Sequence, residues 1–138
     1  NRDILSENKV LTEEELDEIH YLKTGKLIEA CVMCVCLIKQ DIDDITIEKL
    51  IKFSNKFGLA FQIRDDILDE IGDEVQIGKP IKSDIKNNKS SYPSIIGIEK
   101  SQKKAELLIK EASDILNELP FKTDKLKSLC ELVVKRKN

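Results

Sequence analysis

Residues 47–72 read IEKLIKFSNKFGLAFQIRDDILDEIG, a stretch with a helical repeat. Small or apolar residues recur along it at helical spacing: Ile47, Leu50, Ile51, Ser54, Phe57, Gly58, Phe61 and Leu68. This spacing places their side chains on one face of an α-helix. The pattern therefore predicts a long helix that ends at Gly72 and packs against another long helix.

The rest of the chain also predicts helices. Thr12 and Glu15 have capping-box spacing, so a helix begins there and runs to about Lys39. A short helix is expected at 92–97, a long one at about 99–119, and a last one after Thr123 or Asp124, with Leu126, Leu129, Cys130 and Val133 facing inward. Between Gly72 and Ser91 the periodicity fails, which predicts a long functional loop. The predicted fold is all-α, with long, roughly antiparallel helices.

Composition limits the class of protein. The 138 residues are 41% apolar and 36% charged, as expected for one soluble helical domain. The net charge of -3 argues against nucleic acid as a partner, and the longest apolar run, 30–38, is too short to span a membrane. The chain begins Asn1-Arg2-Asp3, with neither an initiator Met nor a secretory signal, so we expect that processing or truncation removed its start.

Four cysteines bear on the compartment: Cys31, Cys34, Cys36 and Cys130. Three of them fall within six residues of a predicted helix, which is poor geometry for disulfides and suits a cytoplasmic protein. A zinc or iron–sulfur site would need more ligands nearby in sequence than this segment supplies. We therefore interpret these cysteines as small apolar core residues.

The most specific chemical feature of the sequence is a cluster of acidic residues at 65–69. Asp65 and Asp69 are four residues apart, Asp66 and Asp69 are three apart, and Gln62 lies one turn earlier, so all four share one helix face. Carboxylates stacked in this way repel one another unless a cation bridges them, and they suit Mg²⁺ shared with substrate phosphates. A solvated acidic surface near a helix end is the alternative.

Two basic features could hold an anion. Residues 78–89 contain four lysines and one aspartate, a local excess of +3. Lys23 and Thr24 precede Gly25 inside a predicted helix, where glycine usually marks the close approach of another backbone or a ligand. An ordinary surface lysine is the alternative for Lys23.

Three segments together resemble the C-terminal half of the trans-isoprenyl diphosphate synthases: IHYLKTG at 19–25, FQIRDDILDEIGD at 61–73 and GKPIKSDIKNNKSSYP at 78–93. The resemblance implies that 1–138 is a single partial domain of a helical fold around a cavity. The N-terminal half, with the first aspartate-rich motif, would be absent. The chain departs from the family at Lys82, where glycine is usual, and at Ser91, where threonine is usual.

The resemblance also implies roles. Asp65, Asp66 and Asp69 match the second aspartate-rich motif, which holds Mg²⁺ against the allylic diphosphate, with Asp65 as the main ligand. The diphosphate-binding lysines of the family match Lys23 and Lys79, and Lys89 matches a further loop lysine. The groups beside the developing allylic cation match Thr24 and Gln62.

The expected activity is that of a Mg²⁺-dependent short-chain prenyltransferase. It would condense isopentenyl diphosphate with an allylic diphosphate, with farnesyl diphosphate as the expected product. A geranylgeranyl diphosphate synthase and a non-catalytic regulatory or diphosphate-binding subunit of the same fold are the alternatives. We expect the whole protein to be a homodimer and the 138 residues alone to be inactive and to expose apolar surface.

Overall fold

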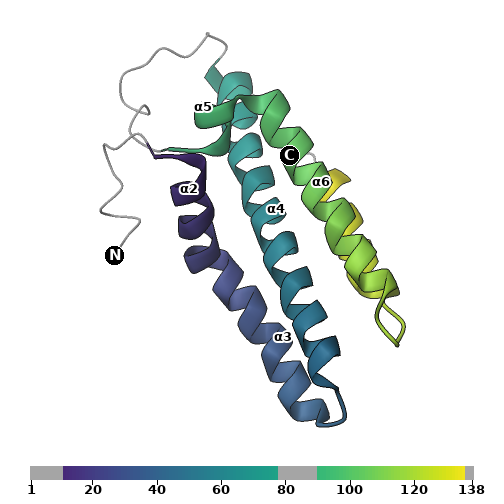
Figure 1. Cartoon of the computed structure of the whole chain (residues 1–138). Helices are drawn as coiled ribbons and strands as arrows, with labels where there is room; N and C mark the ends of the chain where they lie inside the picture. Colours follow the sequence, from purple (N-terminus) through teal and green to yellow (C-terminus); the bar gives the residue numbers. More distant parts are fainter. Residues whose placement is uncertain (1–10, 78–89, 136–138) are drawn as a thin grey trace.

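The computed structural model describes residues 11–77 and 90–135, with side chains for all of these except 73–77. Every element in these ranges is a helix: α2 (Glu13–His20), the π-helix η1 (Tyr21–Gly25), α3 (Lys26–Lys39), α4 (Asp44–Ile77), α5 (Tyr92–Ile96), α6 (Ile98–Asn117) and α7 (Asp124–Lys135). The first three follow one another without a break and run antiparallel to α4 (Figure 1). On the other side α4 packs along α6, which carries α7 (Figure 1). The predicted all-α fold is confirmed.

Local hydrogen bonds explain where two helices begin. Thr12 Oγ1 accepts from the Glu15 amide at 3.2 Å, and Glu15 Oε2 accepts from the Thr12 amide at 2.9 Å. This is the predicted capping box, and it satisfies amides that the first turn of α2 leaves unpaired. Ser91 and Ser94 make the same reciprocal pair at the start of α5. Gly97, at φ 84°, ends α5 as expected.

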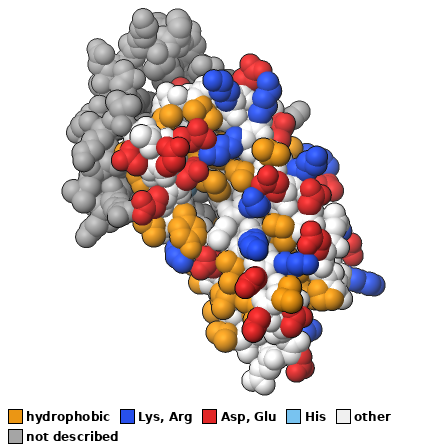
Figure 2. Space-filling model, viewed as in Figure 1, with side chains coloured by type: hydrophobic (Ala, Val, Ile, Leu, Met, Phe, Trp, Pro, Cys, Tyr) orange, Lys and Arg blue, Asp and Glu red, His pale blue; other side chains and the backbone are white. Residues whose placement is uncertain are grey.

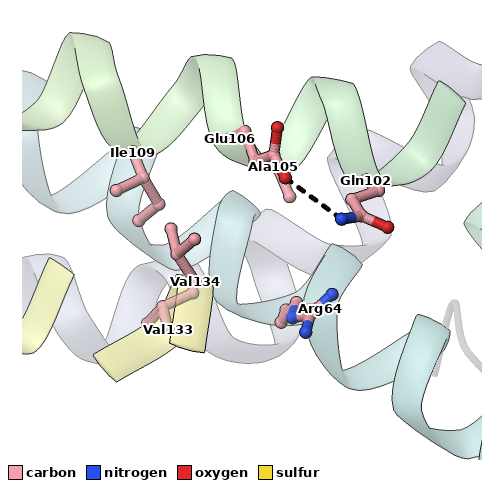
Figure 3. A pocket seen from close by; sticks show the side chains of 7 residues that line it. All are labelled: Arg64, Gln102, Ala105, Glu106, Ile109, Val133 and Val134. Carbon is pink, nitrogen blue, oxygen red and sulfur yellow. Dashed lines mark hydrogen bonds between the residues drawn. The ribbon is translucent and has the colours of Figure 1, made fainter. Parts of the chain in front are cut away.

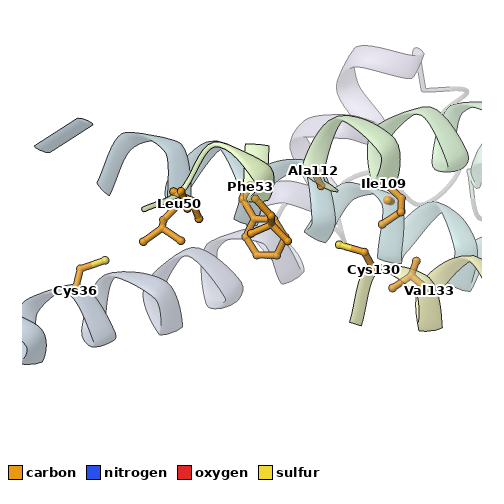
Figure 4. Close-up of a cluster of buried hydrophobic side chains, with 10 residues drawn as sticks. Cys36, Leu50, Phe53, Ile109, Ala112, Cys130 and Val133 are labelled. Atoms are coloured by element: carbon orange, nitrogen blue, oxygen red, sulfur yellow. The ribbon is translucent and has the colours of Figure 1, made fainter. Parts of the chain in front are cut away.

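Two clusters of buried side chains form the core. One lies between α3, α4, α6 and α7 (Figure 4) and contains Cys36, Leu50, Phe53, Ala60, Ile109, Ala112, Leu116, Leu119, Cys130 and Val133. The other joins α2, α4, α5 and α6 and contains Leu11, Leu16, Ile63, Ile67, Tyr92 and Ala105. The second cluster holds together the end of the molecule that carries the polar residues described below.

Three details differ from the sequence-based expectations. Helix α4 continues past Gly72 to Ile77, because one glycine costs only about 1 kcal/mol and no proline follows before Pro80. The apolar-core interpretation is wrong for Cys31 and Cys34, which are exposed, and it holds for Cys36 and Cys130. Leu129 does not face inward, since 46% of its surface is exposed.

The helix crossing at Gly25 confirms the predicted close approach. A Cβ atom on Gly58 of α4 would lie 3.3 Å from the Gly25 Cα and 3.3 Å from Ile28 Cδ1. Such distances leave no room for a larger side chain at Gly58. The two glycines therefore let η1 and α4 approach closely at the turn that carries Lys23 and Thr24.

We expect Gly58→Val to lower the free energy of unfolding by about 1–3 kcal/mol through overpacking of this crossing. Urea unfolding followed by circular dichroism measures the loss. Lys52→Val is the matched control, because it introduces the same β-branched side chain at an exposed position of α4. Equal losses in the two variants would show that helix propensity alone, and not the crossing, is responsible.

Asp43 caps α4 in a way that predicts a pH dependence. Its Oδ1 accepts from the Thr46 amide at 2.8 Å and its Oδ2 from the Thr46 hydroxyl at 3.0 Å, and these bonds lower the pKa of the Asp43 carboxyl. Because the pKa is lower in the folded state, the stabilisation is complete above the unfolded-state pKa, about 4, and is lost as the pH falls through the folded-state value. Asp43→Asn keeps an acceptor but does not titrate. We therefore expect the stability difference between wild type and this variant to change below about pH 4, and a constant difference across urea titrations would contradict this.

Candidate functional site

Four polar residues share one face of α4, and we call Gln62, Asp65, Asp66 and Asp69 the aspartate face. The helical conformation of 44–77 brings them onto this face, as the spacing predicts. Gln62 is buried, Asp65 and Asp66 are half-buried, and Asp69 is exposed. Exposure therefore increases along the face toward the C-terminal end of α4.

Asp66 makes contacts that its position in the sequence does not reveal. Its Oδ2 accepts a hydrogen bond from His20 Nε2 of α2 at 3.1 Å. The same oxygen accepts from the backbone amide of Tyr92, the first residue of α5, also at 3.1 Å. Since an ionised carboxylate only accepts, His20 must carry a hydrogen on Nε2. One aspartate of the face is thus bonded to two other helices.

Tyr92 and Lys104 extend this polar network. The fully buried Tyr92 ring stacks on the His20 ring, with centroids 5.6 Å apart and an interplanar angle of 16°. Lys104 of α6 donates to the Tyr92 hydroxyl at 3.1 Å and lies 4.7 Å from the centroid of that ring. Lys104 also pairs with Glu13 at 2.7 Å and Asp17 at 3.2 Å, although burial still raises the pKa of the Asp17 carboxyl. No local pattern in the sequence predicts these contacts, because they join residues of α2, α4, α5 and α6.

Lys23 and Thr24 lie on the π-helical turn η1, which packs against α4. The Lys26 amide reaches back five residues to the Tyr21 carbonyl, which gives the turn its greater width. Lys23 is exposed and Thr24 is half-buried. Single π-turns inside α-helices are frequent at functional sites. The structure therefore places two predicted site residues on an irregular turn beside the helix of the aspartate face.

The donor set of the aspartate face fits Mg²⁺ only as a partial site. Within the described ranges, no three His, Cys, Asp or Glu side chains gather closely enough to hold a metal ion. Mg²⁺ usually needs only one or two carboxylates and completes its shell with waters and phosphate oxygens. Asp65 and Asp69, one turn apart, match that demand. Lys79 and Lys89 lie outside the described residues.

A small pocket lies between α4, α6 and α7, and no residue of the aspartate face lines it (Figure 3). It is lined by Arg64, Gln102, Ala105, Glu106, Ile109, Val133 and Val134. Its volume of about 10 Å³ is room for roughly one water molecule. This pocket is therefore too small for a prenyl substrate.

Helix α3 shows the expected exposed apolar surface. Leu27, Val35 and Ile38 are 67%, 62% and 81% exposed, and Cys31 between them is also exposed. Their spacing puts them in one stripe along the helix. Hydrophobic side chains are visible at the surface among charged ones in Figure 2. None of the described helices combines the length and apolarity that a membrane crossing requires.

Comparison with known proteins agrees with this arrangement. The family model of polyprenyl synthetases matches residues 2–133. Farnesyl diphosphate synthase of Bacillus subtilis is 42% identical over 134 residues, which cover 97% of this chain and 45% of the relative. Geranylgeranyl diphosphate synthase of Cyanophora paradoxa is 39% identical over 137 residues, 99% of this chain and 45% of the relative.

A solved structure is similar in fold. Geranyltransferase from Helicobacter pylori, complexed with magnesium and isoprenyl diphosphate, superposes with a TM-score of 0.74 at 29% identity and covers 96% of this chain and 43% of that one. The chain therefore belongs to the polyprenyl synthetase family. It spans less than half the length of these relatives.

Proposed function

We propose that the whole protein is a Mg²⁺-dependent short-chain prenyltransferase that condenses isopentenyl diphosphate with an allylic diphosphate to make farnesyl diphosphate. The observation that carries this proposal is the intact aspartate face of α4 beside the π-turn with Lys23 and Thr24, in a chain of this family. In this proposal the 138 residues are the C-terminal half of a cytoplasmic, homodimeric synthase. The free cysteines are consistent with a reducing compartment.

The residues act by charge and position in this mechanism. Asp65, Asp66 and Asp69 would hold Mg²⁺, with Asp65 as the main ligand and the other two acting directly or through water, and the ion would neutralise charge on the leaving diphosphate. The ammonium groups of Lys23 and Lys79 bind the same diphosphate, and Lys89 adds positive charge.

Two further groups act near the allylic carbon in this proposal. The Thr24 hydroxyl and the Gln62 amide carbonyl present oxygen dipoles to the allylic carbon as positive charge develops there. Gln62 is buried, so the packing around it limits the positions that its amide can take. Attack by the double bond of isopentenyl diphosphate and loss of a proton complete the condensation.

Geranylgeranyl diphosphate synthesis is the second candidate, because the relative from Cyanophora paradoxa is named for it and is nearly as similar as the farnesyl enzyme. A non-catalytic subunit is disfavoured, since all three aspartates that would hold Mg²⁺ are present on one face of α4. Product length separates the two synthases.

The test is product analysis of the whole protein. Purified protein is incubated with dimethylallyl and isopentenyl diphosphates and Mg²⁺, and the dephosphorylated products are separated by chromatography. We expect a C15 alcohol, and no product when EDTA removes the metal. A C20 alcohol would favour the second candidate, and the absence of any condensation product would contradict the proposal.

A further inference from the structure

The hydrogen bond between His20 and Asp66 is a contact of the aspartate face that has no role in the proposed mechanism. We propose that His20 is a positioning residue: together with the Tyr92 amide it holds the Asp66 carboxylate in one orientation and so preorganises the aspartate face. This inference rests on the proposed function, because the orientation matters for catalysis only if the face holds Mg²⁺ against a diphosphate.

The geometry fixes Asp66 from two directions. Both donors bond the same oxygen, Oδ2, at 3.1 Å, and they come from α2 and α5, which are separate in sequence. The side chains of His20 and Asp66 are only 7% and 16% exposed. Hydrogen bonds to an ionised acceptor in such a site are stronger than neutral ones, and competition from water is small. These two hydrogen bonds therefore restrict rotation of the Asp66 carboxylate.

The donors are themselves held in place. The His20 ring stacks on the Tyr92 ring, and Lys104 holds the Tyr92 hydroxyl while it pairs with Glu13 and Asp17 of α2. Three helices besides α4 thus contribute to the position of one carboxylate. Outer groups that orient ligand residues in this way usually contribute 10–100-fold to metal affinity or activity.

Packing alone does not explain a histidine at this position. The other ring nitrogen, Nδ1, is buried and has no partner among the described residues. Leucine has a similar volume and would fill the space without leaving a buried polar atom unsatisfied. The bond from Nε2 to Asp66 is therefore what the imidazole contributes.

The first test measures the contact directly in the 138-residue chain. Amide hydrogen exchange is followed by NMR in wild type, His20→Leu, His20→Gln and Tyr21→Phe. The glutamine keeps an N–H donor, and Tyr21→Phe is the matched control, since it removes a bond to the Glu29 carboxylate from the neighbouring residue. The Ile109 amide in the core reports global opening.

In His20→Leu we expect the Tyr92 amide to exchange at least about tenfold faster relative to Ile109. In His20→Gln and Tyr21→Phe it should remain close to wild type. Unchanged Tyr92 exchange in His20→Leu would overturn the inference. If His20→Leu fails to fold, the His20→Gln variant tests the inference instead. Exchange of its Tyr92 amide as fast as in a free peptide would show that a donor at position 20 does not hold Asp66, and would overturn the inference.

The second test measures what the contact does in the whole protein. Calorimetric titration with inorganic pyrophosphate at fixed Mg²⁺ should show an affinity loss of about 10–100-fold in His20→Leu, with partial recovery in His20→Gln. In an Asp66→Asn background, His20→Leu should cause no further loss, and an additive loss would overturn the inference. If the wild type binds no pyrophosphate, the proposed function fails, while the exchange measurement still decides whether His20 fixes Asp66.

Discussion

Asp65→Ala is expected to lower the turnover of the whole protein at least about 100-fold, the scale of losing one preorganised electrostatic contact in an active site. The variant removes the carboxylate that the proposed mechanism assigns as the main Mg²⁺ ligand. Its melting temperature should change little, because Asp65 stands within a group of like charges whose repulsion is relieved. Steady-state kinetics at saturating Mg²⁺ and thermal unfolding measure the two effects.

The matched control for this variant is Glu48→Ala. Glu48 is an exposed carboxylate on the same helix, several turns before the aspartate face. Its removal changes the net charge equally and should leave turnover close to wild type. Near-normal activity of Asp65→Ala would remove Asp65 from the site, and an equal loss in both variants would point to a general effect of charge on the helix.

The 138-residue chain alone is expected to show no prenyl transfer. It carries one aspartate cluster and, in the proposed function, lacks the half that would bind isopentenyl diphosphate. It therefore cannot hold both substrates in reacting geometry. Condensation assays with purified chain, dimethylallyl diphosphate and isopentenyl diphosphate measure this. Measurable product would contradict the division of the active site between two halves.

Weak binding should survive in the same chain. The described residues keep Lys23 and the aspartate face, and Mg²⁺ with diphosphate would relieve carboxylate repulsion in that face. We expect millimolar Mg²⁺ and diphosphate together to raise the melting temperature slightly, and neither to do so alone. No response in a thermal-shift assay would show that the missing half is needed to shape this face.

Local signals in the sequence predicted much of the fold. The predicted capping box at Thr12 depends on side chains three residues apart, so the printed sequence contains the whole interaction. The end of α4 was predicted too early. The free-energy cost of one glycine at Gly72 is small, and the 34-residue helix continues past it. The exposure of Cys31 and Cys34 depends on what packs against α3, which the helix pattern alone does not contain.

The candidate site was also predictable from the sequence only in part. Spacing within one helix placed Asp65, Asp66 and Asp69 on a common face. The contacts of Asp66 join residues 46 and 26 positions away, and no local pattern specifies such pairs. Residue types identified the possible ligands, whereas the polar network that orients one of them emerged only from tertiary structure.

The π-turn has a consequence for how this protein can vary by insertion and deletion. An α-turn bonds residues four apart, but here the Lys26 amide reaches the Tyr21 carbonyl across five, so the turn holds one residue more than an α-helix needs. Deleting one residue there would yield a continuous α-helix, and α2 would keep nearly the same rotation about the helix axis relative to α3, because four α-helical residues turn through almost the same angle as the five residues of the wider turn. His20 and Leu16 would then stay on the buried side. A deletion elsewhere in α2 or α3 would instead rotate one part of the helix by about 100° relative to the other. A one-residue gap in an alignment therefore belongs in this turn, and a gap shifted out of it would assign the wrong residues to the interior of the bundle.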